Sequence, residues 1–212
     1  MLSLERKFLY IHLPKTAGNS VQNILKRYSD DDIVTLHEYQ DGIERFEVRN
    51  KNYRITKHST ITEYKSVLDA EVYASLFKFS TIRNPWDRLI SFYFSTHRGG
   101  LEWNRDNFKQ LISEVPTARH YLCLDPGQTN AGSLASDLDS LLQFERLEEE
   151  FKRVASKLGV RYGSLKKRNS SSHDHYSTYY DDELIAMVES RFAEEIEFGN
   201  YKFETGKRSL WY

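Results

Sequence analysis

The sequence contains a single cysteine, Cys123, which excludes an internal disulfide framework and a cysteine-rich zinc site. It has no run of 18 or more apolar residues, so no stretch is expected to span a membrane. Its start also lacks the apolar core of a signal peptide, and we therefore expect a cytoplasmic protein. Positive charge is not in excess, since 30 Lys and Arg face 31 Asp and Glu. This balance argues against bulk binding of nucleic acid.

The composition and the pattern along the chain favour one folded domain. A length of 212 residues with 39% hydrophobic content suits a domain with a substantial core. Strands are predicted at 8–13, 33–36, 77–82 and 141–144, and helices at 21–28, 62–68, 85–93, 108–115, 147–158 and from 181 or 182 to 192. The alternating segment 42–57 favours a hairpin that turns near residues 50–52. This order predicts a single α/β domain over residues 1–212 with a mostly parallel central sheet flanked by helices.

The first candidate site lies where the strand at 8–13 ends and a helical period begins at Val21. A strand, a tight loop and a helix N-terminus direct backbone N–H groups and the helix dipole at one anion. The segment adds one positive charge and hydroxyl and amide donors; its residues are Lys15, Thr16, Ala17, Gly18, Asn19 and Ser20. We interpret it as a phosphate or sulfate cradle, the alternative being an ordinary turn with a surface lysine. It is not a Walker A loop, because the lysine precedes the glycine and no glycine stands four or five residues upstream.

A second strand–helix corner follows residues 77–82. Asn84 can cap a helix, Pro85 suits its first position, and Asp87 places a carboxylate in its first turn. Arg83 stands at the strand end, and Ser91 follows eight residues later, about 12 Å along a helix at ~1.5 Å per residue. We interpret Asp87 and its neighbour Arg88 as a structural pair on or near the helix surface.

Both corners together resemble a known family. The segments Tyr10-Ile11-His12-Leu13-Pro14-Lys15-Thr16-Ala17-Gly18-Asn19-Ser20 and Phe79-Ser80-Thr81-Ile82-Arg83-Asn84-Pro85-Trp86-Asp87-Arg88-Leu89-Ile90-Ser91 are similar to the sulfotransferases that use 3′-phosphoadenosine-5′-phosphosulfate (PAPS). The resemblance is closest to the carbohydrate branch, Golgi-type and bacterial, and it continues through 143–151 and 179–201. It implies a P-loop-like three-layer fold, a hydroxyl of a carbohydrate or glycolipid-like molecule as the acceptor, the product nucleotide PAP, and no metal.

The resemblance also implies roles for individual residues. Residues 15–20 would bind the 5′-phosphosulfate, and Arg83 with Ser91 the 3′-phosphate. Lys15 would stabilise the charge that develops on the bridging oxygen as the nucleotide leaves. His58 would act as the base that takes the acceptor's proton, since a histidine titrates near neutral pH; the alternative is a histidine that only hydrogen-bonds a loop. Arg168, in a short basic run at 166–168, would close over the 3′-phosphate unless that run is only a solvated loop.

Two alternatives remain open at this point. One is an ATP-using P-loop transferase of the kinase type, against which the order of lysine and glycine argues. The other is a nucleotide-binding protein with the same fold and no catalysis. Family members of eukaryotic origin usually carry an N-terminal membrane anchor, whereas this chain begins about seven residues before its first predicted strand. We therefore expect a bacterial-type soluble enzyme or a trimmed catalytic domain, with the oligomeric state and the exact acceptor left open.

Overall fold

A computed structural model of the chain describes residues 1–37, 45–95, 102–125, 127, 134–161, 163–165 and 173–206. The described strands form two sheets. The larger sheet has the strand order β1 (Leu2–Ser3), β2 (Phe8–Ile11), β5 (Phe77–Ile82) and β6 (Ser140–Gln143). The smaller sheet pairs β3 (Asp31–His37) with β4 (Arg45–Asn50).

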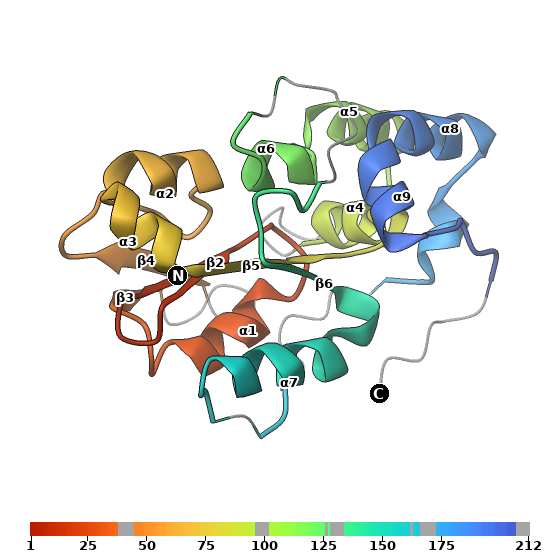
Figure 1. Cartoon of the computed structure of the whole chain (residues 1–212). Helices are drawn as coiled ribbons and strands as arrows, with labels where there is room; N and C mark the ends of the chain where they lie inside the picture. The colour runs from red at the N-terminus through yellow and green to blue at the C-terminus, as the bar shows by residue number, and fades with distance from the viewer. Residues whose placement is uncertain are drawn as a thin grey trace.

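Helices cover both faces of the larger sheet, with α1 and α7 on one side and α2, α3, α4 and α6 on the other (Figure 1). In chain order the described α-helices are α1 (Gly18–Leu25), α2 (Ile61–Val67), α3 (Ala70–Ser75), α4 (Pro85–Tyr93), α5 (Arg105–Glu114), α6 (Ala118–Leu122), α7 (Leu147–Lys157), α8 (Asp182–Arg191) and α9 (Ala193–Gly199). In the described ranges, no helix is both long and apolar enough to cross a bilayer. The arrangement confirms the predicted α/β class with three layers.

The strand directions place the two predicted corners at one edge of the sheet. β2 pairs with β5 in parallel, with Ile11 opposite Ser80, and β5 pairs with β6 in parallel. Among the described strands of this sheet, β1, at its edge, is the one antiparallel to its neighbour. Because the carboxyl ends of neighbouring parallel strands lie together, the loops after β2 and β5 must be adjacent.

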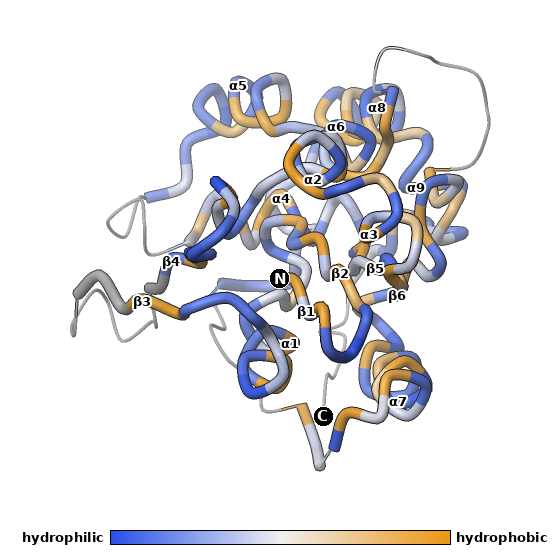
Figure 2. The backbone as a smooth tube through the Cα atoms, turned by 60° about the vertical axis from the view of Figure 1, so that its left-hand side comes forward, coloured by the Kyte–Doolittle hydropathy of each residue, from blue (hydrophilic) through white to orange (hydrophobic). Residues whose placement is uncertain are grey.

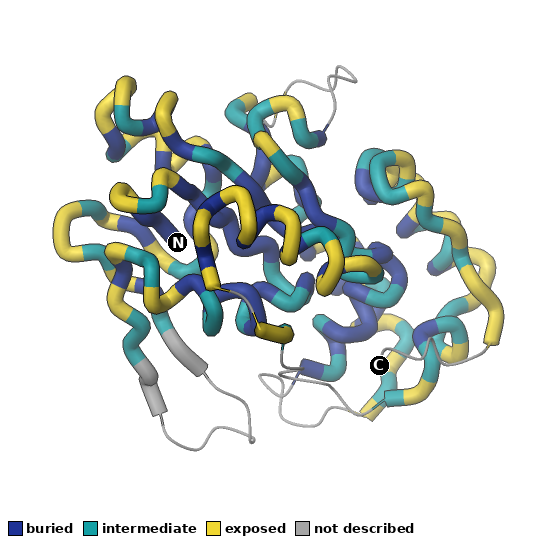
Figure 3. Tube along the Cα trace, turned by 60° about the horizontal axis from the view of Figure 1, so that its bottom comes forward, coloured by how far each residue is buried: buried dark blue, intermediate teal, exposed yellow. Residues whose placement is uncertain are grey.

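The alternation of β2 explains how both faces of the sheet are buried. Phe8 and Tyr10 point to the side where α1 and α7 pack, whereas Leu9 and Ile11 point to the side of α2, α3 and α6. Successive side chains of a strand face opposite ways, so a strand covered on both faces is apolar throughout. Buried segments accordingly run through the middle of the molecule (Figure 3). α7 alternates hydrophobic and hydrophilic stretches along its length, as a helix with one buried face does (Figure 2).

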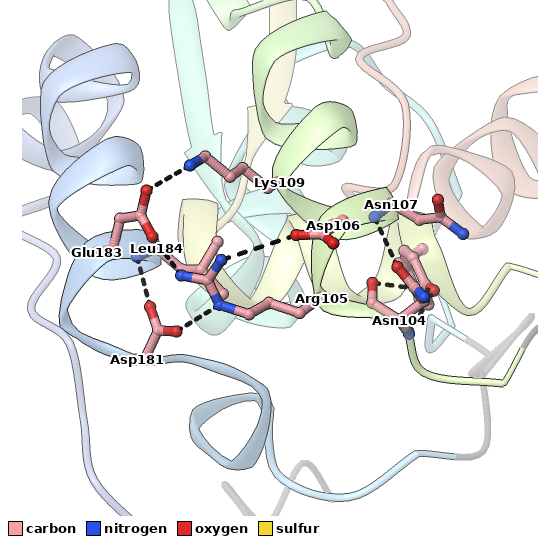
Figure 4. Close-up of polar contacts among 9 residues, drawn as sticks. Asn104, Arg105, Asp106, Asn107, Lys109, Asp181, Glu183 and Leu184 are labelled. Atoms are coloured by element: carbon pink, nitrogen blue, oxygen red, sulfur yellow. Dashed lines mark hydrogen bonds and ion pairs between the residues drawn. The ribbon is translucent and has the colours of Figure 1, made fainter.

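A third apolar cluster joins α4, α5 and α8 beside the sheet. At the exposed edge of this cluster, Arg105 Nε donates to Asp181 Oδ2 at 2.7 Å, and Glu183 contacts both Arg105 and Lys109 (Figure 4). Because these charged groups are solvent-exposed, they contribute little to stability compared with the apolar contacts beneath them.

The hairpin predicted within residues 42–57 does not form, because the strand in this segment pairs with an earlier strand of the chain. β4 pairs with β3, so Ile33 lies opposite Val48, and no strand follows residue 50 before α2 in the described chain. The predicted turn near residues 50–52 does exist, because Asn50 Oδ1 accepts from Asn52 N at 2.9 Å and from Tyr53 N at 3.1 Å. It ends β4 and leads into the segment that carries His58. The short helices α3, α6 and α9 were not predicted.

Candidate active site

The two corners meet at the carboxyl ends of β2 and β5. Arg83, directly after β5, donates from Nη1 to the backbone carbonyl of Lys15 at 3.1 Å. This contact spans 68 residues of sequence and joins the loop after β2 to the loop after β5. The fold therefore brings the two corners together.

The loop after β2 enters α1 through a backbone of unusual conformation. Lys15 and Ala17 have φ angles of 68° and 66°, in the left-handed region that non-glycine residues rarely adopt. Ala17 is the N-cap of α1 and makes no side-chain cap bond. Ser20 N donates to the Ala17 carbonyl at 2.9 Å, so within the described chain the N–H groups of Gly18 and Asn19 are the ones left without a cap. Backbone of this kind, at a helix N-terminus, forms a nest that suits an anion.

Gly18 is required by a close approach of the ring of His12. A Cβ added at Gly18 would lie 1.9 Å from His12 Cδ2 and Nε2, closer than any non-bonded contact allows. His12 itself follows β2 and is buried, with its ring 4.6 Å from that of His58 by their centroids. The imidazole thus lies between the start of α1 and His58.

The hydroxyl of Thr16 lies beneath the loop. It donates to the carbonyl of Leu13 at 2.8 Å and lies 2.7 Å from Thr81 Oγ1, which in turn is 3.1 Å from Tyr10 OH. Thr16 is fully buried. The sequence suggested a hydroxyl donor for an anion, but the side chain instead ties the loop to β5.

The pKa of the Lys15 ammonium is lowered in the folded protein. Burial, and secondly the nearby Arg83 guanidinium, lower the pKa of its ammonium from the ordinary 10.5 to about 8. At neutral pH the side chain is still mainly charged, but it gives up its proton more readily than an exposed lysine does.

Arg83 is held in place by Asp87 on the first turn of α4. Its Nε and Nη2 donate to Asp87 Oδ2 at 2.9 and 2.6 Å, and the guanidinium lies 4.3 Å from the centre of the Phe144 ring. A guanidinium has five N–H donors, and Asp87 with the Lys15 carbonyl engages three of them. Within the described part of the chain, two donors remain for an anion.

The predicted pairing of Asp87 with Arg88 on the helix surface was wrong. Asp87 pairs with Arg83, and Arg88 is only 2% exposed. The Arg88 guanidinium donates from Nε to the carbonyl of Pro14 at 3.1 Å and from Nη2 to that of Pro116 at 3.0 Å. Its Nη1 lies 3.9 Å from Glu195 Oε1 on α9. α4 is buried on nearly all sides, so the position next to its apolar stripe is interior as well.

Asn84 caps α4 as predicted, since its side chain accepts from Trp86 N at 3.1 Å. Glu145, a residue without a predicted role, supports the same corner. Its Oε1 accepts from Asn84 N at 2.8 Å and its Oε2 from Tyr201 OH at 2.8 Å. Burial raises the pKa of this carboxyl. The only signal in the sequence was the resemblance of residues 143–151 to the family's block.

The other predicted residues fall around these corners. Asn19 and Ser20 belong to the first turn of α1, and Ser91 is buried in α4. His58 precedes α2, whose N-cap Thr60 forms a capping box with Glu63. The Nδ1 atom of His58 lies 3.0 Å from the carbonyl oxygen of His12, so His58 is fastened to the same loop as Lys15. Arg168 lies outside the described residues.

The comparisons with known proteins identify a family for the chain. Neither a curated protein nor a solved structure matches the chain significantly. The family model described as "Sulfotransferase family" matches residues 1–202, a span that includes both corners, His58 and Glu195. The chain therefore belongs to the sulfotransferase family.

Proposed function

We propose that this protein transfers a sulfuryl group from PAPS to a hydroxyl group of a carbohydrate or glycolipid-like acceptor, and that residues 1–212 act as one sulfotransferase domain. The observation that carries the proposal is the 3.1 Å hydrogen bond between Arg83 and the Lys15 carbonyl. It brings two anion-binding corners together, as one nucleotide with phosphates at both ends of its ribose requires.

The first corner fits the 5′-phosphosulfate. The N–H groups of Gly18 and Asn19 begin α1 without a side-chain cap, and the helix dipole favours an anion beside them. Asn19 and Ser20 can add side-chain donors there. Gly18 lets the helix start lie directly on the His12 ring, and a bulkier residue would displace these donors.

The second corner fits the 3′-phosphate. Arg83 keeps two N–H donors beyond those engaged by Asp87 and Lys15, and a planar guanidinium suits phosphate oxygens. The hydroxyl of Ser91 is the second predicted donor, and Arg168 is a third.

The chemistry we propose is an in-line displacement at sulfur. The acceptor oxygen forms a bond to sulfur while the bond between sulfur and the bridging oxygen breaks, and PAP departs with that oxygen. The Lys15 ammonium stabilises the negative charge on the departing oxygen. With its pKa lowered to about 8, it can also donate a proton to that oxygen more readily than an ordinary lysine.

His58 is the proposed base. A carbonyl oxygen can only accept, so the 3.0 Å contact with His12 requires the hydrogen of the neutral imidazole to be on Nδ1. The lone pair is then on Nε2, which would take the proton of the acceptor hydroxyl. The same carbonyl would stabilise the imidazolium that results, because hydrogen bonds from charged donors are stronger.

Transfer of ³⁵S from labelled PAPS to a panel of glycans, glycolipids and phenols tests the proposal. The protein should label a hydroxyl-bearing acceptor without Mg²⁺ or ATP. In His58→Ala, kcat should fall about 10²- to 10⁴-fold, as for the loss of a general base, while PAP should still bind. The exposed His120 serves as the matched control, and His120→Ala should keep its activity. Labelling that requires ATP, or full activity in His58→Ala, would contradict the proposal.

A further inference from the structure

The peptide groups on both sides of Lys15 are each held by an arginine of the second corner. The carbonyl that precedes Lys15, that of Pro14, accepts from Arg88 Nε at 3.1 Å. The carbonyl that follows, that of Lys15 itself, accepts from Arg83 Nη1 at 3.1 Å. Both arginines come from one strand–helix junction, five positions apart. Because the orientation of these two carbonyls is set by φ and ψ of Lys15, the two arginines together restrain its backbone.

Lys15 needs such restraint, because its φ of 68° lies in the left-handed region. A β-carbon makes this conformation unfavourable, and it persists only where surrounding contacts over-determine it. Pro14 on one side also limits the choices of the chain. Without the arginines, the loop would relax toward a more common conformation and carry the lysine side chain with it.

The Arg88 side chain is buried, and its hydrogen bonds hold it in place. It is 2% exposed, and Glu195, its counter-charge, is also 2% exposed. Glu195 Oε1 additionally accepts from Ala118 N at 2.6 Å, and Arg88 Nη2 donates to the Pro116 carbonyl at 3.0 Å. The guanidinium therefore connects the Lys15 loop to the start of α6 and to α9, three segments far apart in the sequence.

We propose that Arg88 is a positioning residue for sulfuryl transfer, which holds Lys15 in its left-handed conformation through the Pro14 carbonyl, with Glu195 of α9 as its buried counter-charge. This inference rests on the proposed function, in which Lys15 acts on the departing oxygen. Arg88 itself touches neither the donor nor the acceptor. It acts through the loop backbone. Through Glu195, α9 also helps to hold Lys15 in position.

Arg88→Lys is the informative substitution. A lysine retains the positive charge beside Glu195 but cannot donate simultaneously to two carbonyls in the directions of a guanidinium. Arg191→Lys is the matched control, because Arg191 Nη2 also donates to a backbone carbonyl, that of Val115 at 3.2 Å, and Arg191 does not contact the Lys15 loop.

Two readouts separate positioning from simple support of the fold. In Arg88→Lys, kcat should fall about 100-fold, as for a displacement of about 1 Å at a reacting centre. The Kd of PAP should rise less than ~10-fold, since Lys15 acts mainly in the transition state. Titration of the Lys15 side chain by NMR should show its pKa moving from about 8 toward the ordinary 10.5, because a relaxed loop exposes the ammonium and separates it from Arg83. Arg191→Lys should change neither quantity.

The outcomes also distinguish this inference from the proposed function. If the wild-type protein binds no PAP and transfers no sulfuryl group, the proposed function fails, while the pKa of Lys15 still tests the restraint. If Arg88→Lys leaves both kcat and that pKa unchanged, or if Arg191→Lys alters them equally, the positioning role is wrong. Should Arg88→Lys not fold, the ¹⁵N signal of Arg88 Nε in the wild-type protein replaces it. PAP should shift that signal and leave the signal of Arg191 unmoved, and a stationary Arg88 signal would refute the proposal.

Discussion

Replacement of Lys15 by methionine should stabilise the nucleotide-free protein at neutral pH. Lys15 is partly buried, and its pKa is lowered from 10.5 to about 8 by burial and by Arg83. A lysine whose pKa is lowered in the folded state disfavours folding while it is charged. Between pH 8 and pH 10.5 the unfolded chain binds more protons than the folded one, so the stability of the wild-type protein rises across that window.

The size of the effect follows from the same values. A pKa lowered by roughly 2.5, at about 1.36 kcal/mol per pKa unit, corresponds to about 3 kcal/mol at pH 7. This is an upper bound for the gain in Lys15→Met, because methionine keeps the left-handed φ of 68° and its associated cost. The lysine would thus be retained, at a cost in stability, for the role proposed above.

Urea unfolding at pH 7 and pH 10.5 measures this gain. Lys15→Met should unfold at higher urea concentration than wild type at pH 7, and the gap should nearly close at pH 10.5, where the folded lysine is neutral and the unfolded one is half protonated. Lys152→Met, on the exposed face of α7, controls for the change to an apolar side chain and should lie within about 0.5 kcal/mol of wild type. PAP should reverse the order, since it stabilises the form that binds it. The reasoning would be refuted if Lys15→Met were less stable than wild type at pH 7. It would also be refuted if the gain in stability over wild type were the same at both pH values.

Three further substitutions test separate parts of the structure. Gly18→Ala should cost about 1–3 kcal/mol of stability in urea unfolding and weaken PAP binding, because its Cβ would meet the His12 ring at 1.9 Å; unchanged PAP affinity would argue against the tight helix start. Glu195→Ala should cost about 3–5 kcal/mol by the same measurement, since it leaves Arg88 buried without its counter-charge, and a loss below about 1 kcal/mol would contradict that pairing. Arg105→Ala should lower the melting temperature only slightly and not at all in 1 M NaCl, because its partners are exposed; a large loss that persists in salt would be inconsistent with a surface network.

The parts of the fold predicted from the sequence are those set by local patterns. The apolar runs at 77–82 and 141–144 became β5 and β6, and the Asn84–Pro85 pair marked the start of α4. These signals are contained in a few neighbouring residues. The pairing of β3 with β4 was missed, because an alternating pattern shows that a strand exists but not which strand it joins.

The sequence also indicated the two strand–helix corners, whereas the contacts that hold them together could not be predicted. Lys15 and Arg83 stand at strand ends that a parallel sheet brings together. Arg88 was placed on the surface because charged side chains are rarely buried, and nothing local reveals that α9 and the loop after β2 enclose α4. The direction of the Thr16 hydroxyl likewise depends on Thr81, which is distant in the sequence.

A calorimetric titration with PAP, compared with adenosine 3′-monophosphate and adenosine 5′-monophosphate, tests the central claim most directly. If the corners at Lys15 and Arg83 hold opposite ends of one nucleotide, PAP should bind one-to-one and more than about tenfold tighter than either monophosphate, a difference above ~1.4 kcal/mol. An absence of binding, or an affinity for PAP no greater than for a monophosphate, would show that the two corners do not form a common site.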